Sequence, residues 1–155
     1  MLDEKVALVT GGARGLGWAV ARALAEHGAR LVLADMDREG CEAAAARLRS
    51  GGAQVVAVAG NVAAVADVEA MVGAAAGSFG RLDILVNNAG GSAHTPLDIE
   101  DVTEEQFDRV MAWNVRGTFF CIKSALPHLK VRGGSIINVA SIAGRAGTEL
   151  VSPQY

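Results

Sequence analysis

Residues that mark disorder or metal sites are scarce in this sequence. Of its 155 residues, 3 are Pro, 2 are Cys and 3 are His, while 51% are hydrophobic, which argues against a disordered chain. Cys41 and Cys121 have no metal or redox spacing, so we expect two reduced, partly buried thiols. His27, His94 and His128 lie far apart in the sequence, so we do not expect metal catalysis.

The sequence also lacks an excess of basic charge and long apolar runs. The net charge is −3 and the pI is about 5.6, which argues against a nucleic-acid or anionic-membrane partner. No run approaches the ~18 apolar residues of a membrane span. The N-terminus shows no basic region followed by an apolar stretch, as a signal peptide would. We therefore expect a cytoplasmic protein of one compact domain.

What the sequence does contain is an alternation of short apolar runs with longer Ala-rich segments. The runs have the composition of strands covered on both faces, and the longer segments have that of half-buried helices. The expected strands are Val6–Val9, Leu31–Ala34, Val55–Ala59, Ile84–Val86 and Ile136–Val139. The expected helices are Leu16–His27, Glu39–Arg49, Val65–Ser78 and Glu104–Leu129. This alternation predicts an α/β fold, a doubly wound parallel sheet with ligands bound beyond the carboxyl ends of its strands.

A glycine-rich turn follows the first expected strand. In Thr10–Gly17, Gly11 can form the tight turn, Gly15 allows a pyrophosphate to approach the backbone, and Gly17 allows close packing of the helix. The helix that follows would offer unpaired N–H groups and a partial positive charge to the phosphates. The spacing Gly-x-x-x-Gly-x-Gly differs from the commoner G-x-G-x-x-G pattern, and the turn lacks the Lys of a P-loop.

The second expected strand leads to Asp35, 18 residues after Gly17. A carboxylate at this point can accept hydrogen bonds from the adenosine ribose and would repel a 2′-phosphate. Asp37 adds to that repulsion and is also placed to cap the next helix. Arg14 and Arg38 act in the opposite direction, because guanidinium groups bind phosphate. The sequence favours NAD over NADP and leaves NADP open.

Together with Asn87-Asn88-Ala89-Gly90, this turn resembles the short-chain dehydrogenase/reductase family over the whole chain. The resemblance implies a three-layer Rossmann fold with strand order 3-2-1-4-5 and an oxidoreductase acting on secondary alcohols or ketones. Its cofactor would be NAD or NADP, and the parent protein would be a homodimer or homotetramer. The implied cofactor contacts are Gly11, Arg14, Gly15, Leu16, Gly17, Asp35, Asn61, Val62, Asn88, Ala89 and Gly90. Asn61 stands where the family usually has Asp, yet it keeps an acceptor oxygen for adenine.

The resemblance also implies three catalytic residues. Asn114 would hold a water in the proton relay, Ser141 would donate to the substrate oxygen, and Tyr155 would act as the acid or base. Asn114 lies on the long expected helix, which Thr103 and Gln106 should cap. Ser141 is not in a G-x-S-x-G elbow, so a hydrolase is not indicated. The spacing from Ser141 to Tyr155 is one residue longer than is usual in the family.

The family's lysine, which lowers the tyrosine pKa, would fall at position 159, beyond residue 155. We therefore expect residues 1–155 to be a single, C-terminally incomplete NAD(P)-binding domain, inactive or at best a weak cofactor binder when alone. One alternative is a non-catalytic NAD-binding module, although pure binding would not need Asn114, Ser141 or Tyr155. Another is a sugar epimerase or dehydratase, which usually has a different glycine spacing. The substrate is left open beyond a secondary alcohol or ketone.

Overall fold

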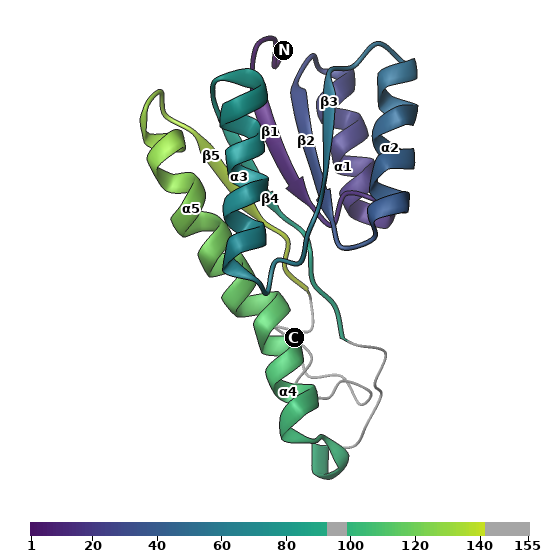
Figure 1. Ribbon diagram of the computed structural model, residues 1–155, viewed down its shortest axis with the longest axis vertical. Coiled ribbons are helices and arrows are strands. Elements are labelled where there is room, and N and C mark those ends of the chain that lie inside the picture. The colour runs from purple at the N-terminus through teal and green to yellow at the C-terminus, as the bar shows by residue number, and fades with distance from the viewer. Residues whose placement is uncertain (93–98, 142–155) are drawn as a thin grey trace.

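A computed structural model describes residues 1–92 and 99–141, which form a parallel five-stranded sheet between two layers of helices (Figure 1). The strand order is β3-β2-β1-β4-β5, as predicted. The strands are β1 (Val6–Thr10), β2 (Arg30–Asp35), β3 (Val55–Ala59), β4 (Ile84–Asn87) and β5 (Ser135–Asn138). The helices are α1 (Gly15–Glu26), α2 (Arg38–Ser50), α3 (Val65–Phe79), α4 (Glu104–Met111) and α5 (Thr118–Lys130), with a 3-10 turn η1 (Ile99–Asp101) and a π-helix η2 (Ala112–Gly117).

The central strand β1 divides its side chains between two cores. Val6 and Leu8 face the layer of α3 and α5, whereas Ala7 and Val9 face the layer of α1 and α2. All four residues are fully buried, because successive side chains of a strand point to opposite faces and both faces are covered. Burial on both faces explains why the strands have unbroken apolar runs in the sequence.

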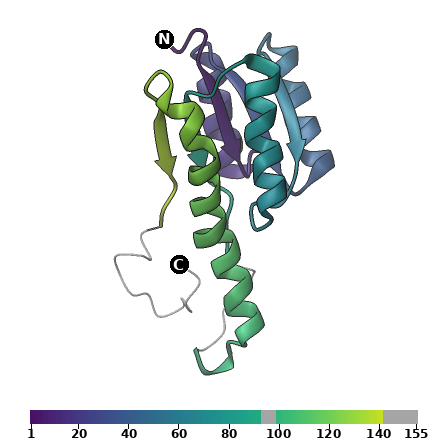
Figure 2. The ribbon, with the colours of Figure 1, turned by 60° about the vertical axis from the view of Figure 1, so that its left-hand side comes forward.

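The long expected helix Glu104–Leu129 is interrupted in the structure. Thr103 accepts from Gln106 in a capping box, so α4 begins as predicted, but the segment then passes through η2 before α5. Figures 1 and 2 show these elements as one rod that extends well past the end of the sheet. On α4, Val110 is buried, whereas Phe107 is 44% exposed. Phe107 belongs to α4, which lies in the part of this rod that projects past the end of the sheet.

The burial of strand β5 differs from the prediction. Its four residues are exposed, whereas the apolar run Ile136–Val139 suggested cover on both faces. Within the described ranges β5 lies at the edge of the sheet, paired only with β4 and packed on α5. None of the helices that the structure describes is long and apolar enough to cross a membrane.

Candidate cofactor-binding site

The turn between β1 and α1 is built around two glycines that have no room for a side chain. Gly11 has φ of +65°, and a Cβ there would lie 2.8 Å from the Asn88 amide nitrogen. A Cβ on Gly17 would lie 2.0 Å from the Gly11 carbonyl oxygen, because the first turn of α1 packs directly on the loop. Gly15 also has a positive φ, +57°, yet nothing lies within 4 Å of its ideal Cβ. The side of the turn at Gly15 is therefore open.

Hydrogen bonds across the sheet tie this turn to the end of β4. The buried Thr10 hydroxyl accepts from the backbone N–H groups of Asn88 and Ala89, each at 3.1 Å. The Asn88 side chain donates in return to the carbonyl oxygens of Thr10 and Gly11, at 3.0 and 3.1 Å. The glycine turn and the Asn88–Gly90 segment therefore form one unit.

Asp35 is the last residue of β2, and Asn61 lies two residues after the end of β3. One Asp35 carboxylate oxygen accepts from the Ala13 N–H at 3.1 Å and the other from the Asp37 N–H at 3.0 Å. Each oxygen keeps a second lone pair for a ligand hydroxyl. The Asn61 side-chain oxygen accepts from the Ala63 N–H at 3.0 Å, which orients the amide in its loop. Asp37 caps α2 by accepting from Gly40 N–H, as predicted.

These segments surround a cleft of about 550 Å³ at the carboxyl ends of the strands, within the usual size range of ligand sites. Of the predicted cofactor contacts, ten line it, namely Gly11, Arg14, Leu16, Gly17, Asp35, Asn61, Val62, Asn88, Ala89 and Gly90. Gly15 belongs to the same turn but is not among the lining residues. Arg38 is exposed at the start of α2, also outside the lining.

Asn114 lies in η2, beside the loop that follows β4. Its side-chain oxygen accepts from the Gly91 N–H at 2.9 Å, and its amide donates to the Gly91 carbonyl oxygen at 3.2 Å. A Cβ on Gly90 would lie 2.5 Å from the Asn114 oxygen, so this glycine is needed for the approach. The neighbouring Trp113 lines the cleft. The structure thus brings Asn114 to the edge of the predicted cofactor site.

The structure describes only some of the other residues singled out in the sequence. Ser141 comes three residues after Asn138, the last residue of β5, at the end of the sheet where the cleft lies. Tyr155 and His94 lie outside the described residues. Within the described ranges no cluster of potential metal ligands occurs. The two thiols are free and fully buried rather than partly so, and burial raises the pKa of both Cys41 and Cys121 to about 11.

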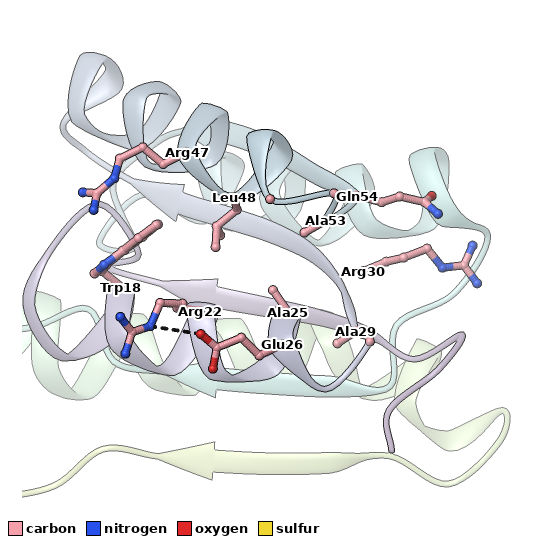
Figure 3. A pocket seen from close by; sticks show the side chains of 13 residues that line it. Trp18, Arg22, Ala25, Glu26, Ala29, Arg30, Arg47, Leu48, Ala53 and Gln54 are labelled. Atoms are coloured by element: carbon pink, nitrogen blue, oxygen red, sulfur yellow. Dashed lines mark ion pairs between the residues drawn. The ribbon is translucent and has the colours of Figure 1, made fainter.

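A second cavity, of about 470 Å³, lies between α1 and α2 (Figure 3). Its lining includes Arg30, the first residue of β2, and Gln54, which directly precedes β3. It therefore reaches the amino ends of these strands, away from the glycine turn. Arg22 pairs with Glu26 at 3.5 Å, and the Arg47 guanidinium lies 4.6 Å from the Trp18 ring centre. In parallel sheets ligands bind at the opposite ends of the strands, which favours the first cleft.

Three features of the site were not predicted from the sequence. The Thr10 hydroxyl that joins β1 to β4 could have been suspected, since a threonine that ends a buried strand needs a partner. Trp113 could have been suspected only from its place beside Asn114. The π-helix had no local signal in the sequence, and its contacts are with two loops that are distant along the chain.

Comparison with known proteins agrees with this geometry. The family model described as short chain dehydrogenase matches residues 5–153. The chain is 42% identical over 153 residues to galactitol 2-dehydrogenase of Agrobacterium fabrum, covering 97% of this chain and 58% of that protein. It is 41% identical to sorbitol dehydrogenase of Cereibacter sphaeroides, over 97% of this chain and 57% of the relative. It is 43% identical to D-threitol dehydrogenase of Mycolicibacterium smegmatis, over 92% of this chain and 54% of that protein.

The chain thus spans a little over half the length of these curated relatives. The matched segment nevertheless includes the complete glycine turn, Asp35, Asn61, the Asn88–Gly90 segment and Asn114. Sequence similarity and the geometry of the cleft lead to the same conclusion: the chain belongs to the short-chain dehydrogenase family.

Proposed function

We propose that residues 1–155 form a single dinucleotide-binding domain of an oxidoreductase that transfers a hydride between NAD(P) and a secondary alcohol or ketone. The observation that carries this proposal is the convergence of the glycine turn, Asp35, Asn61 and Asn88 on one cleft. Loops at the carboxyl ends of parallel strands are where doubly wound folds bind dinucleotides.

The glycine turn suits a pyrophosphate. No side chain caps the first turn of α1, where the residue preceding the helix is Arg14. Its N–H groups can therefore bind phosphate oxygens, helped by the partial positive charge of the helix N-terminus. The positive φ of Gly15 and the open space at its ideal Cβ allow a ligand to approach the backbone. Gly11 and Gly17 hold this surface in shape by packing on Asn88 and on each other.

Asp35 supports NAD over NADP as the cofactor. Two backbone N–H groups hold its carboxylate at the cleft, and the exposed Asp37 lines the same region. A 2′-phosphate here would meet two carboxylates, whereas ribose hydroxyls can donate to them. Arg14 also lines the cleft and would favour phosphate, but it equally serves the pyrophosphate at the start of α1.

Three residues would serve the reaction itself. The bound nicotinamide would supply the hydride chemistry. Ser141 would hydrogen-bond the substrate oxygen. Tyr155 would act as the acid or base toward that oxygen. Asn114 would hold a water of the proton relay, with its side-chain amide oriented by Gly91.

Galactitol, sorbitol and threitol in the names of the relatives suggest a polyol as the substrate. The alternative of a non-catalytic NAD-binding module gains no support from these relatives. A homodimeric or homotetrameric parent protein and a cytoplasmic location stay predictions.

Titration of NADH and NADPH, followed by nicotinamide fluorescence, tests the proposal. We expect tighter binding of NADH by the unaltered protein. In Asp35→Ala the preference should shift toward NADPH by about tenfold or more, since each 1.4 kcal/mol of lost repulsion is a factor of ten. The exposed Asp108→Asn, in α4, is the control and should leave both affinities unchanged. Failure of both cofactors to bind would overturn the proposed function, and an NADPH preference in the unaltered protein would overturn the assignment of NAD.

A further inference from the structure

The π-helix η2 lies between two loops of the cofactor cleft and contacts both. On one side Asn114 exchanges two hydrogen bonds with the backbone of Gly91, in the loop after β4. On the other side the Arg116 guanidinium donates to the Ala63 carbonyl oxygen, in the loop after β3. The first loop continues from the Asn88–Gly90 segment, and the second contains the predicted adenine contacts Asn61 and Val62.

The contact with the second loop is close. A Cβ on Gly117 would lie 2.9 Å from a Val62 methyl carbon and 3.1 Å from the Val62 carbonyl oxygen. The helix backbone therefore packs directly on the loop backbone, and neither can move far without the other. Arg116 is held in place for its bond by the Phe120 ring, whose centre lies 4.9 Å from the guanidinium carbon.

Two hydrogen bonds and a short stretch of the π-helix connect the adenine loop to Asn114. The Asn61 side chain accepts from Ala63 N–H, and the Ala63 carbonyl accepts from Arg116, two residues along the π-helix from Asn114. The Thr118 hydroxyl, at the start of α5, donates to the Asn114 carbonyl oxygen at 2.9 Å. A π-turn is a rare irregularity within an α-helix, and such turns are frequent at functional sites.

We propose that Arg116 is a positioning residue that couples occupation of the adenosine end of the cleft to the placement of Asn114. A base bound at Asn61 would order the loop, fix the Ala63 carbonyl and, through Arg116, hold the π-helix in the register that presents Asn114. This inference rests on the proposed function, because it takes Asn61 as an adenine contact and Asn114 as part of the proton relay. Energetic coupling between sites is carried by packed side chains and hydrogen-bond networks, and the contacts above form such a network.

The test is a titration of the 15N-labelled protein with AMP, followed by NMR. AMP carries the adenosine half of the cofactor and no nicotinamide, so it has no group that belongs beside Asn114. The Asn114 side-chain amide signals are assigned by their absence in Asn114→Asp. In the unaltered protein, AMP should shift both the Asn61 and the Asn114 signals, with the same dissociation constant. In Arg116→Met, which keeps an unbranched stem over Phe120 but lacks the donor, the Asn61 shift should persist and the Asn114 shift should be lost.

Two further variants separate the coupling from a general structural effect. Arg116→Lys keeps a donor and a charge, so it should retain part of the Asn114 shift. Lys123→Met removes the other cation over the Phe120 ring, at 5.5 Å, without touching the loop, and should behave as the unaltered protein. An AMP shift at Asn61 with none at Asn114 in the unaltered protein, or full retention of both in Arg116→Met, would overturn the coupling alone. Absence of any AMP response would overturn the proposed cofactor site and the coupling with it.

Discussion

At the scale of single residues, the glycine turn shows that similar glycines can be required for different reasons. Gly17 has an ordinary φ but no space, since its Cβ would overlap the Gly11 carbonyl oxygen at 2.0 Å. Gly15 has ample space but a left-handed backbone, with φ of +57°. The sequence predicted the close packing at Gly17, whereas the left-handed backbone of Gly15 and the open space around it come from the structure.

This difference predicts unequal effects of the same substitution. Gly15→Ala should lower the free energy of unfolding by roughly 1–2 kcal/mol, the cost of placing a Cβ in the left-handed region, and it should weaken NADH binding only in part. Gly17→Ala must move either α1 or the backbone of the turn, so it should abolish NADH binding. Urea unfolding and NADH titration of the two variants measure both effects. Equal losses of binding in the two variants would contradict this account of the turn.

At the scale of elements, the amino ends of three strands are joined by Asp83, which directly precedes β4. Its carboxylate accepts from the Val6 N–H of β1 at 2.9 Å and from the Arg81 guanidinium, and Lys5 lies at 3.7 Å. Its carbonyl oxygen accepts from Ser135 N–H at the start of β5. Burial by itself would raise the pKa of Asp83, but the hydrogen bonds from Arg81 and Val6 and the charges of Arg81 and Lys5 outweigh it and lower that pKa.

A carboxyl with a lowered pKa in the folded state stabilises the protein above the unfolded-state pKa, near ~4. That contribution is lost as the pH falls through the lower folded-state value. Asp83→Asn should therefore destabilise the protein at pH 7 by roughly 1.5–3 kcal/mol, the range for hydrogen bonds to a charged group. It should also flatten the decline of stability below about pH 4. Urea unfolding from pH 7 to pH 3 measures both, with the exposed Asp108→Asn as control. An unchanged acid slope in Asp83→Asn would contradict this role.

The sequence predicted elements well wherever a strong periodic pattern coincided with local end signals. All five strands were found within one or two residues, and the predicted caps at Asp37 and Thr103 are present. The π-helix and the exposed face of β5 were not predicted, because both depend on which distant segments lie against them. Asp83 likewise carries no local signal, since its partners on β1 and β5 come together only in the folded sheet.

At the scale of the whole molecule, two separate cores share one sheet. Cys121 lies in the core formed with α3 and α5, and Cys41 lies in the core formed with α1 and α2. The strands β1 and β2 contribute side chains to both cores. We therefore expect the two layers to unfold together, which is what the proposal of a single domain requires.

The reactivity of the two thiols measures whether the two layers unfold together. Each thiol is buried in one core, and its pKa is raised to about 11. Only the thiolate reacts with disulfide reagents, so native labelling at pH 8 should be very slow in both single-cysteine variants, Cys41→Ala and Cys121→Ala. As urea is added, the two labelling rates should rise at the same concentrations and give the same free energy of opening. Ala46→Cys, on the exposed side of α2 in a background without the native thiols, should label at once and supplies the intrinsic rate. If Cys121 became reactive at clearly lower urea than Cys41, the layer of α3 and α5 would open as a separate unit, and the single-domain proposal would be wrong.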